Sequence, residues 1–158
     1  MRNENTDRNQ VPKLHKYLVN ANLISPGMEI LDFGSGRYVS GAKYLTQYGI
    51  FCTRYDPYKL PESRNSMALS KNYDAVLCSN VLNVIPTKLE LLSAFDLATS
   101  LSKRVYFSIY EGDKTNVPRA TKCGFQWNTK TKEMIKLIEE NRPYIPITHL
   151  AMNMFYVG

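Results

Sequence analysis

The sequence has few of the residues that build disulfide frameworks or metal centres. Its 158 residues contain three cysteines, Cys52, Cys78 and Cys123, which lie far apart with no Cys-x-x-Cys pair. Such spacing is typical of reduced thiols in a cytoplasmic protein. The two histidines, His15 and His149, are equally isolated and poorly placed for a catalytic base. We therefore expect neither a disulfide nor a bound metal.

Long apolar runs are also absent. No stretch approaches the ~20 apolar residues that a membrane-spanning helix needs, and residues 1–10 are polar throughout, unlike a signal peptide. We expect these residues to form a flexible polar tail before one compact domain, residues 11–158, in a cytoplasmic protein without membrane contacts. The net charge of +6 permits a polyanionic partner such as nucleic acid without requiring one.

The most informative motif is an apolar strand that ends in an acidic residue and runs into two glycines. A strand is predicted over residues 29–33, with Asp32 near its end and Gly34-Ser35-Gly36 directly behind it. A helix is predicted next, from Val39 to Tyr48. Glycines lack a Cβ and let the backbone approach a ligand. Strand, tight turn and helix in this order are typical of a nucleotide-cofactor site at the carboxyl end of a strand.

The details of the motif favour S-adenosylmethionine (SAM) over a dinucleotide. The dinucleotide fingerprint requires a third glycine where Val39 stands. Asp32 would repel a pyrophosphate, but it would attract the ammonium group of the methionine part of SAM. Methyltransferase loops usually have a third glycine at the position of Tyr38, so the match to them is incomplete. An ordinary turn without a ligand is the alternative.

Hydrophobic periodicity predicts an alternation of strands and helices. A helix after Pro12 is indicated by apolar residues at helical spacing up to Leu23, and Thr87 is expected to cap a helix that reaches Leu101. Further strands are predicted at 50–55, 73–78 and 104–109, a helix at 130–141, and one or two strands within 144–157. Residues 57–71 hold a short helix or a weak strand, and 110–129 form a polar segment. The pattern predicts an α/β fold: a doubly wound, mostly parallel sheet with helices on both faces.

A second acidic residue, Asp56, ends the second predicted strand, 20 residues after Gly36. A carboxylate there can accept hydrogen bonds from both ribose hydroxyls of an adenosine cofactor. Pro57 and Tyr58 follow where an adenine ring would lie, and Glu62 is the only acidic candidate for adenine recognition between 61 and 72. A turn aspartate followed by a surface tyrosine is the alternative.

The third strand is followed by small polar residues, Ser79 and Asn80. In a doubly wound sheet this edge lies beside the first strand, so we expect both residues to line the cofactor site. Asn83 either caps a helix or contacts substrate, and we favour capping. The run after the strand lacks the Asn/Asp-Pro-Pro-Tyr sequence of enzymes that methylate base amino groups.

Three stretches together resemble the class I SAM-dependent methyltransferases: Asp32 to Arg37, Tyr55 to Tyr58, and Asn80 to Ile85. Within that family the sequence is most similar to methyltransferases associated with DNA phosphorothioation and to short phage-encoded relatives. The phage branch is indicated by Ser108 to Lys114 and by the stretch from Gln126 to Lys132. The resemblance spans most of residues 12–142.

The resemblance implies a Rossmann-like methyltransferase fold, SAM as cofactor and, for a phage protein, the host cytoplasm as location. It implies that Asp32, Gly34 and Gly36 contact the methionine part of SAM and that Asp56 contacts the ribose. Methyl transfer from a sulfonium is an in-line displacement in which alignment supplies most of the catalysis, so no dedicated base is required. Asn80, Tyr110 and Glu111 are weak candidates for groups that orient the acceptor.

The acceptor pocket is expected between the first helix and the segment 110–129. Residues 110–132 contain five basic and two acidic side chains, together with Trp127. Such a mixture can bind nucleic acid, although a solvated loop anchored on the core by Trp127 is the simpler reading. Three functions stay open: a SAM-dependent methyltransferase with an unidentified acceptor, a SAM-binding regulator or SAM-depleting factor without transferase activity, and a nucleic-acid-binding protein on the same fold. The oligomeric state is open as well, and Val39 and Asp32 argue against a nicotinamide-dependent enzyme.

Overall fold

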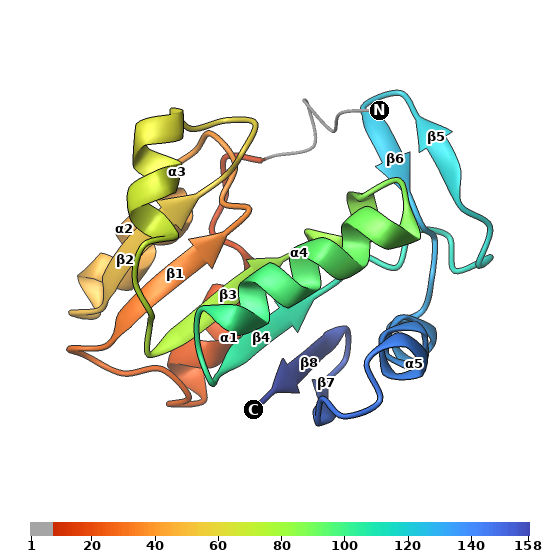
Figure 1. Cartoon of the computed structure of the whole chain (residues 1–158). Coiled ribbons are helices and arrows are strands. Elements are labelled where there is room, and N and C mark those ends of the chain that lie inside the picture. Colours follow the sequence, from red (N-terminus) through yellow and green to blue (C-terminus); the bar gives the residue numbers. More distant parts are fainter. Residues whose placement is uncertain (1–7) are drawn as a thin grey trace.

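A computed structural model describes residues 8–158. Its centre is a six-stranded sheet in which four parallel strands are extended by an antiparallel hairpin (Figure 1). The strand order is β2-β1-β3-β4-β8-β7. The parallel strands are β1 (Glu29–Phe33), β2 (Phe51–Tyr55), β3 (Ala75–Ser79) and β4 (Val105–Ser108). The hairpin consists of β7 (Ile147–Ala151) and β8 (Met154–Val157), and β8 pairs antiparallel with both β4 and β7.

Helices cover both faces of this sheet, as the sequence predicted. In Figure 1, α4 lies in front of the sheet and α1 lies behind it. The core clusters place α1 (Lys13–Asn20) and α2 (Ser40–Gln47) on one face. They place α3 (Glu62–Ala68), α4 (Lys88–Ser100) and α5 (Thr131–Asn141) on the other. The predicted α/β fold with a mostly parallel, doubly wound sheet is therefore confirmed.

The two faces of the sheet follow from the alternation of side chains along each strand. In β1, Leu31 and Phe33 join the core under α4, whereas Ile30 joins the core under α1 and α2. Asp32 lies two residues from Ile30, so it is on the α1 face. This position carries the carboxylate toward α1 rather than toward α4.

Several local predictions are confirmed and others need correction. Thr87 caps α4, since its Oγ1 accepts a hydrogen bond from the Glu90 N–H at 3.2 Å. Asn83 is not the cap, which corrects our expectation: it lies in a 3-10 turn, Leu82–Val84, before the helix begins. The unassigned region after β2 forms the short helix α3. The polar segment 110–129 contains a hairpin that we did not predict, β5 (Arg119–Thr121) and β6 (Gly124–Gln126).

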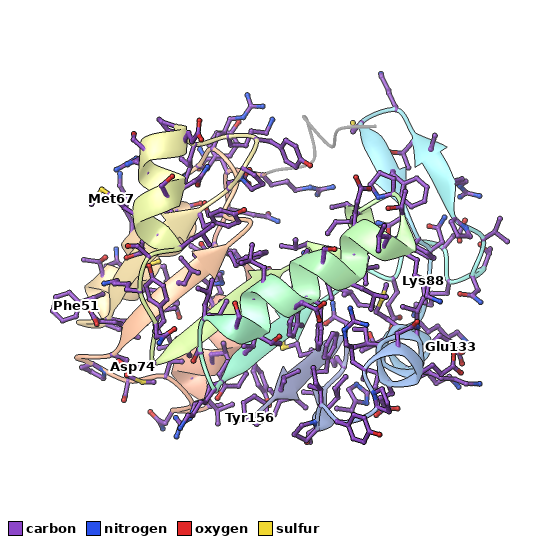
Figure 2. All side chains as sticks on the ribbon, in the orientation of Figure 1. Phe51, Met67, Asp74, Lys88, Glu133 and Tyr156 are labelled. Carbon is purple, nitrogen blue, oxygen red and sulfur yellow. The ribbon has the colours of Figure 1, made fainter. Side chains whose placement is uncertain are left out.

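The structure also bears on the expected tail, on membrane contacts and on the state of the cysteines. Residues 1–7 of the expected tail lie outside the described residues. Within residues 8–158, no helix is long and apolar enough to cross a membrane. All three cysteines are free. Figure 2 shows Phe51 pointing outward at the β2 edge of the sheet, where it is 66% exposed.

Candidate functional site

The carboxyl ends of the four parallel strands lie at one edge of the sheet. From β1 the chain passes to β2 on one side, and it later returns to β3 on the other side of β1. This reversal makes the gap between β1 and β3 the switch point, where doubly wound sheets bind their ligands. Three segments that follow or end these strands lie at this edge: the loop 34–36 after β1, Asp56 after β2, and Ser79-Asn80 at the end of β3.

Both glycines of the loop are in the left-handed region, with φ +75° at Gly34 and +70° at Gly36. At Gly34 the space is also too small for a side chain, because an added Cβ would lie 2.5 Å from Val81 Cγ2. The N–H groups of Gly34 and Ser35 both donate to the Tyr55 carbonyl, at 2.7 and 3.1 Å. The loop is therefore held between the ends of β2 and β3.

Asp56 holds the same loop through its carboxylate. Oδ2 accepts the Gly36 N–H at 2.9 Å, and Oδ1 accepts the N–H groups of Tyr58 and Lys59 at 2.9 and 3.1 Å. Asn65 of α3 brackets the Asp56 backbone, donating to its carbonyl and accepting from its N–H. A carboxylate offers about four acceptor positions, so about one is left for a ligand. Asp56 thus has the turn role that the sequence left open as the alternative, and it also holds Gly36.

Arg54 of β2 adds a second clamp on this loop. Its Nη2 donates to the Gly36 carbonyl at 2.7 Å. Both polar groups of the Gly36 backbone therefore have partners at the end of β2, Asp56 for the N–H and Arg54 for the carbonyl. The loop conformation is set before any ligand arrives, which lowers the entropy cost of binding.

Asp32 lies beneath the loop and is 5% exposed. His15 of α1 contacts it, with Nε2 3.2 Å from Asp32 Oδ2. His15 is fully buried. Sequence reasoning missed this residue, because the two positions are brought together only by the packing of α1 on the sheet. The available signal was the place of His15 between Leu14 and Leu18, which are both buried.

The end of β3 is joined to the end of β4 through serine hydroxyls. Ser79 Oγ and Ser108 Oγ lie 3.3 Å apart, and the Asn80 N–H donates to the Ser108 carbonyl at 2.9 Å. Asn80 has φ +56° and an exposed side chain. Asparagine tolerates this conformation better than most residues, and non-glycine residues held in it cluster at functional sites.

The β5–β6 hairpin is anchored beside the same edge. The Trp127 N–H donates to the Asn83 carbonyl at 3.0 Å, and Trp127 Nε1 donates to the Ile85 carbonyl at 2.7 Å. These contacts agree with the simpler reading of Trp127 as an anchor. Asn83 is 2% exposed, and its side-chain Oδ1 has no hydrogen-bond partner among the described residues.

Of the two residues considered for acceptor contacts after β4, Glu111 is already engaged. Its Oε1 accepts two hydrogen bonds from Thr131 at the start of α5, one from the backbone N–H and one from the Oγ1 hydroxyl, both at 2.8 Å. Burial raises the pKa of Glu111, but the Thr131 hydrogen bonds and Lys114 outweigh it, so the pKa lies below its ordinary value. Tyr110, by contrast, is 61% exposed.

The outer residues of the proposed adenine region, Pro57, Tyr58 and Glu62, are all exposed, with Glu62 in the first turn of α3. The segments 34–36, 56–58 and 79–80 are thus gathered at one edge, as predicted. Two hollows on the surface lie away from it. One of about 440 Å³ adjoins the start of β2, and one of about 340 Å³ lies near Tyr106 and Tyr156.

Thiol and metal chemistry are not indicated here. Burial raises the pKa of Cys78, and the Asp32 carboxylate raises it further. Burial likewise raises the pKa of Cys52. Both thiols therefore stay protonated near neutral pH, although they lie within strands that lead to the site. No group of three or more potential metal ligands occurs within residues 8–158.

Comparison with known proteins reveals similarity in fold. No protein-family model and no curated protein matches the sequence. Among solved structures, the chain is similar to 1,6-didemethyltoxoflavin-N1-methyltransferase from Burkholderia thailandensis, determined with 1,6-didemethyltoxoflavin and S-adenosylhomocysteine. The TM-score is 0.67 at 16% identity, covering 92% of this chain and 75% of that one.

Two further structures show the same relationship. Magnesium protoporphyrin IX methyltransferase from Synechocystis, determined with bound SAM, has a TM-score of 0.58 at 18% identity, over 91% of this chain and 75% of that one. A SAM-dependent methyltransferase from Mesorhizobium loti has a TM-score of 0.55 at 14% identity, over 92% and 97%. The chain therefore has the Rossmann-like fold that these methyltransferases share.

Proposed function

We propose that this protein is a SAM-dependent methyltransferase whose cofactor binds at the carboxyl edge, over the loop Gly34-Ser35-Gly36. The observation that carries the proposal is this loop. It has two left-handed glycines, a carboxylate beneath it in Asp32, and a second carboxylate at the end of β2 in Asp56. The bound SAM and S-adenosylhomocysteine of the similar structures support the same cofactor.

Each residue of the edge would have a distinct task. Asp32 would accept hydrogen bonds from the methionine ammonium, and the backbone of the glycine loop would contact the same end of the cofactor. Asp56 would use its remaining acceptor position for a ribose hydroxyl. Pro57 and Tyr58 would flank the adenine. Ser79 and Asn80, at the end of β3, would line the methionine part.

The cofactor supplies an activated methyl group on a sulfonium, so the protein has mainly to align donor and acceptor. Glu111 is committed to the start of α5 by the Thr131 hydrogen bonds. Asn80 and Tyr110 are therefore the stronger candidates for orienting the acceptor, since both are exposed at strand ends of this edge. The acceptor is unidentified. A relationship to phosphorothioation-associated and phage enzymes, with a cytoplasmic location, is part of the same proposal and rests on sequence motifs alone.

A SAM-binding protein without transferase activity is the second candidate. It is favoured by the engagement of Glu111 with Thr131 and Lys114, which removes one of the three candidates for orienting an acceptor. A nucleic-acid-binding function is favoured less. Two basic residues of the polar segment are paired with acids, Lys114 with Glu111 and Arg119 with Asp113.

Isothermal titration with SAM, S-adenosylhomocysteine and NAD tests the proposal. We expect both sulfur compounds to bind, NAD not to bind, and Asp32→Ala to weaken binding. Asp74→Ala is a matched control, because this aspartate directly precedes β3 at the amino ends of the parallel strands (Figure 2) and accepts the Glu29 N–H there. If the folded wild type binds neither sulfur compound, the proposal is refuted.

A further inference from the structure

The buried imidazole of His15 is not explained by packing alone. His15 lies on the buried face of α1 beside Leu14 and Leu18, and all three side chains are fully buried. Neither ring nitrogen of His15 has a hydrogen-bond partner among the described residues. A buried polar group without a partner is destabilising, and an apolar side chain at this position would avoid that penalty. The buried imidazole therefore calls for a polar task.

The neighbouring carboxylate of Asp32 defines that task. His15 Nε2 lies 3.2 Å from Asp32 Oδ2, which is within hydrogen-bond reach, but the ring is not aligned with the oxygen. The structure records no hydrogen bond to the Asp32 carboxylate from residues 8–158. Polar contacts at functional sites are often poorly aligned before the ligand binds and tighten in the complex. A small rotation of the ring or the carboxylate would align this pair.

Gly41, in the first turn of α2, makes the approach of His15 possible. A Cβ at this position would lie 3.2 Å from His15 Nε2 and 3.3 Å from His15 Cδ2. These contacts are tighter than ordinary van der Waals distances, so a methyl group would displace the ring. The close packing of α1 on α2 at Gly41 thus holds the imidazole against Asp32.

We propose that His15 is a positioning residue for the methionine end of the cofactor. Its Nε2–H donates to Asp32 Oδ2 in the complex and fixes the carboxylate so that Oδ1 accepts from the ammonium group. This inference rests on the proposed function. It makes α1 part of the cofactor site, although His15 itself is buried and does not reach the exposed edge.

Two ligands separate this role from a general effect on folding. S-adenosylhomocysteine carries the ammonium group, whereas 5′-methylthioadenosine has the same nucleoside and sulfur but no amino-acid part. We would titrate both into the wild type, His15→Leu, His15→Gln and Gly41→Ala, after thermal melts show that each variant is folded. His15→Leu fills the space without a donor, and the Gln amide N–H can reach the position of Nε2.

We expect His15→Leu to weaken S-adenosylhomocysteine binding by about tenfold or more and to leave 5′-methylthioadenosine binding unchanged. His15→Gln should restore most of the loss, and Gly41→Ala should show part of it. Equal binding of S-adenosylhomocysteine by wild type and His15→Leu would overturn the inference while leaving the proposed function intact. Equal loss of both ligands in His15→Leu would also overturn it. A wild type that binds neither ligand would refute the proposed function itself.

Discussion

Replacement of Gly34 by alanine tests whether the glycine loop is closed by the strands on either side of it. Two separate penalties act at this position. Alanine in the left-handed region costs about 1–2 kcal/mol. The new methyl group would also lie 2.5 Å from Val81 Cγ2, and overpacking of this kind costs about 1–3 kcal/mol. We therefore expect Gly34→Ala to lower the free energy of unfolding by about 3 kcal/mol.

Gly27 provides the matched control. It also has a left-handed backbone, with φ +88°, but nothing lies within 4 Å of an added Cβ. Gly27→Ala should therefore show the backbone penalty alone, about 1–2 kcal/mol. In a chain of this size, 1 kcal/mol shifts the melting temperature by about 2–4 °C. The expected decreases are thus about 6–12 °C for Gly34→Ala and about 2–8 °C for Gly27→Ala.

Urea and thermal unfolding followed by circular dichroism would measure both variants. A double-mutant cycle with Val81→Ala should show favourable coupling, because removal of the Val81 methyl groups relieves the contact with Ala at 34. Equal destabilisation by Gly34→Ala and Gly27→Ala, or no coupling to Val81→Ala, would refute the view that the loop after β3 packs directly on the glycine loop.

Three further predictions concern α5, α4 and the thiols. Because the Thr131 hydrogen bonds outweigh burial and hold the pKa of Glu111 below its ordinary value of 4.5, the carboxylate stabilises the fold above that pH and loses this effect as the pH falls further. The stability advantage of the wild type over Glu111→Gln in urea unfolding should therefore shrink below pH 4.5; a constant difference down to pH 3 would contradict this account. Thr87→Ala should lower the free energy of unfolding by about 1 kcal/mol through loss of the α4 cap. Thr87→Ser keeps the capping hydroxyl and should therefore preserve most of the wild-type stability. Iodoacetamide should modify the exposed Cys123 in the native protein and spare Cys78, which is buried and has a raised pKa; peptide mass spectrometry that finds Cys78 modified first would exclude this arrangement.

The elements with strong periodicity could be predicted from the sequence. The first strand, its glycine turn and the helix capped by Thr87 each combine an apolar repeat with a local signal, and these elements lie close to their predicted positions. The gathering of Asp32, Asp56 and Ser79 at one edge followed from the parallel order of the strands. A parallel sheet leaves little choice about which strand ends meet.

Features that depend on distant contacts could not be predicted. The strands β5 and β6 have three residues each, which is too short for an alternating pattern. Trp127, which follows β6, is held by the carbonyl of Ile85, 42 residues earlier in the sequence. The capping of α5 by Glu111 and the hydrogen bond from the Gly36 N–H to Asp56, 20 residues away, are of the same kind.

His15 shows the limit most clearly. Nothing in the spacing of His15 and Asp32 indicates contact, because they lie on different elements and meet only through the packing angle of α1. The contact also needs a residue without a side chain at Gly41, where a Cβ would lie 3.2 Å from His15 Nε2. Our prediction described both histidines as isolated and poorly placed for a catalytic base, and the structure places one of them against the buried carboxylate of the site.

A crystal structure with S-adenosylhomocysteine tests the central claim most directly. The account predicts that the ligand lies over Gly34-Ser35-Gly36, with its ammonium group within hydrogen-bond distance of Asp32 and a ribose hydroxyl at Asp56. A ligand bound elsewhere on the surface, or bound at this edge with its ammonium group away from Asp32, would contradict the account.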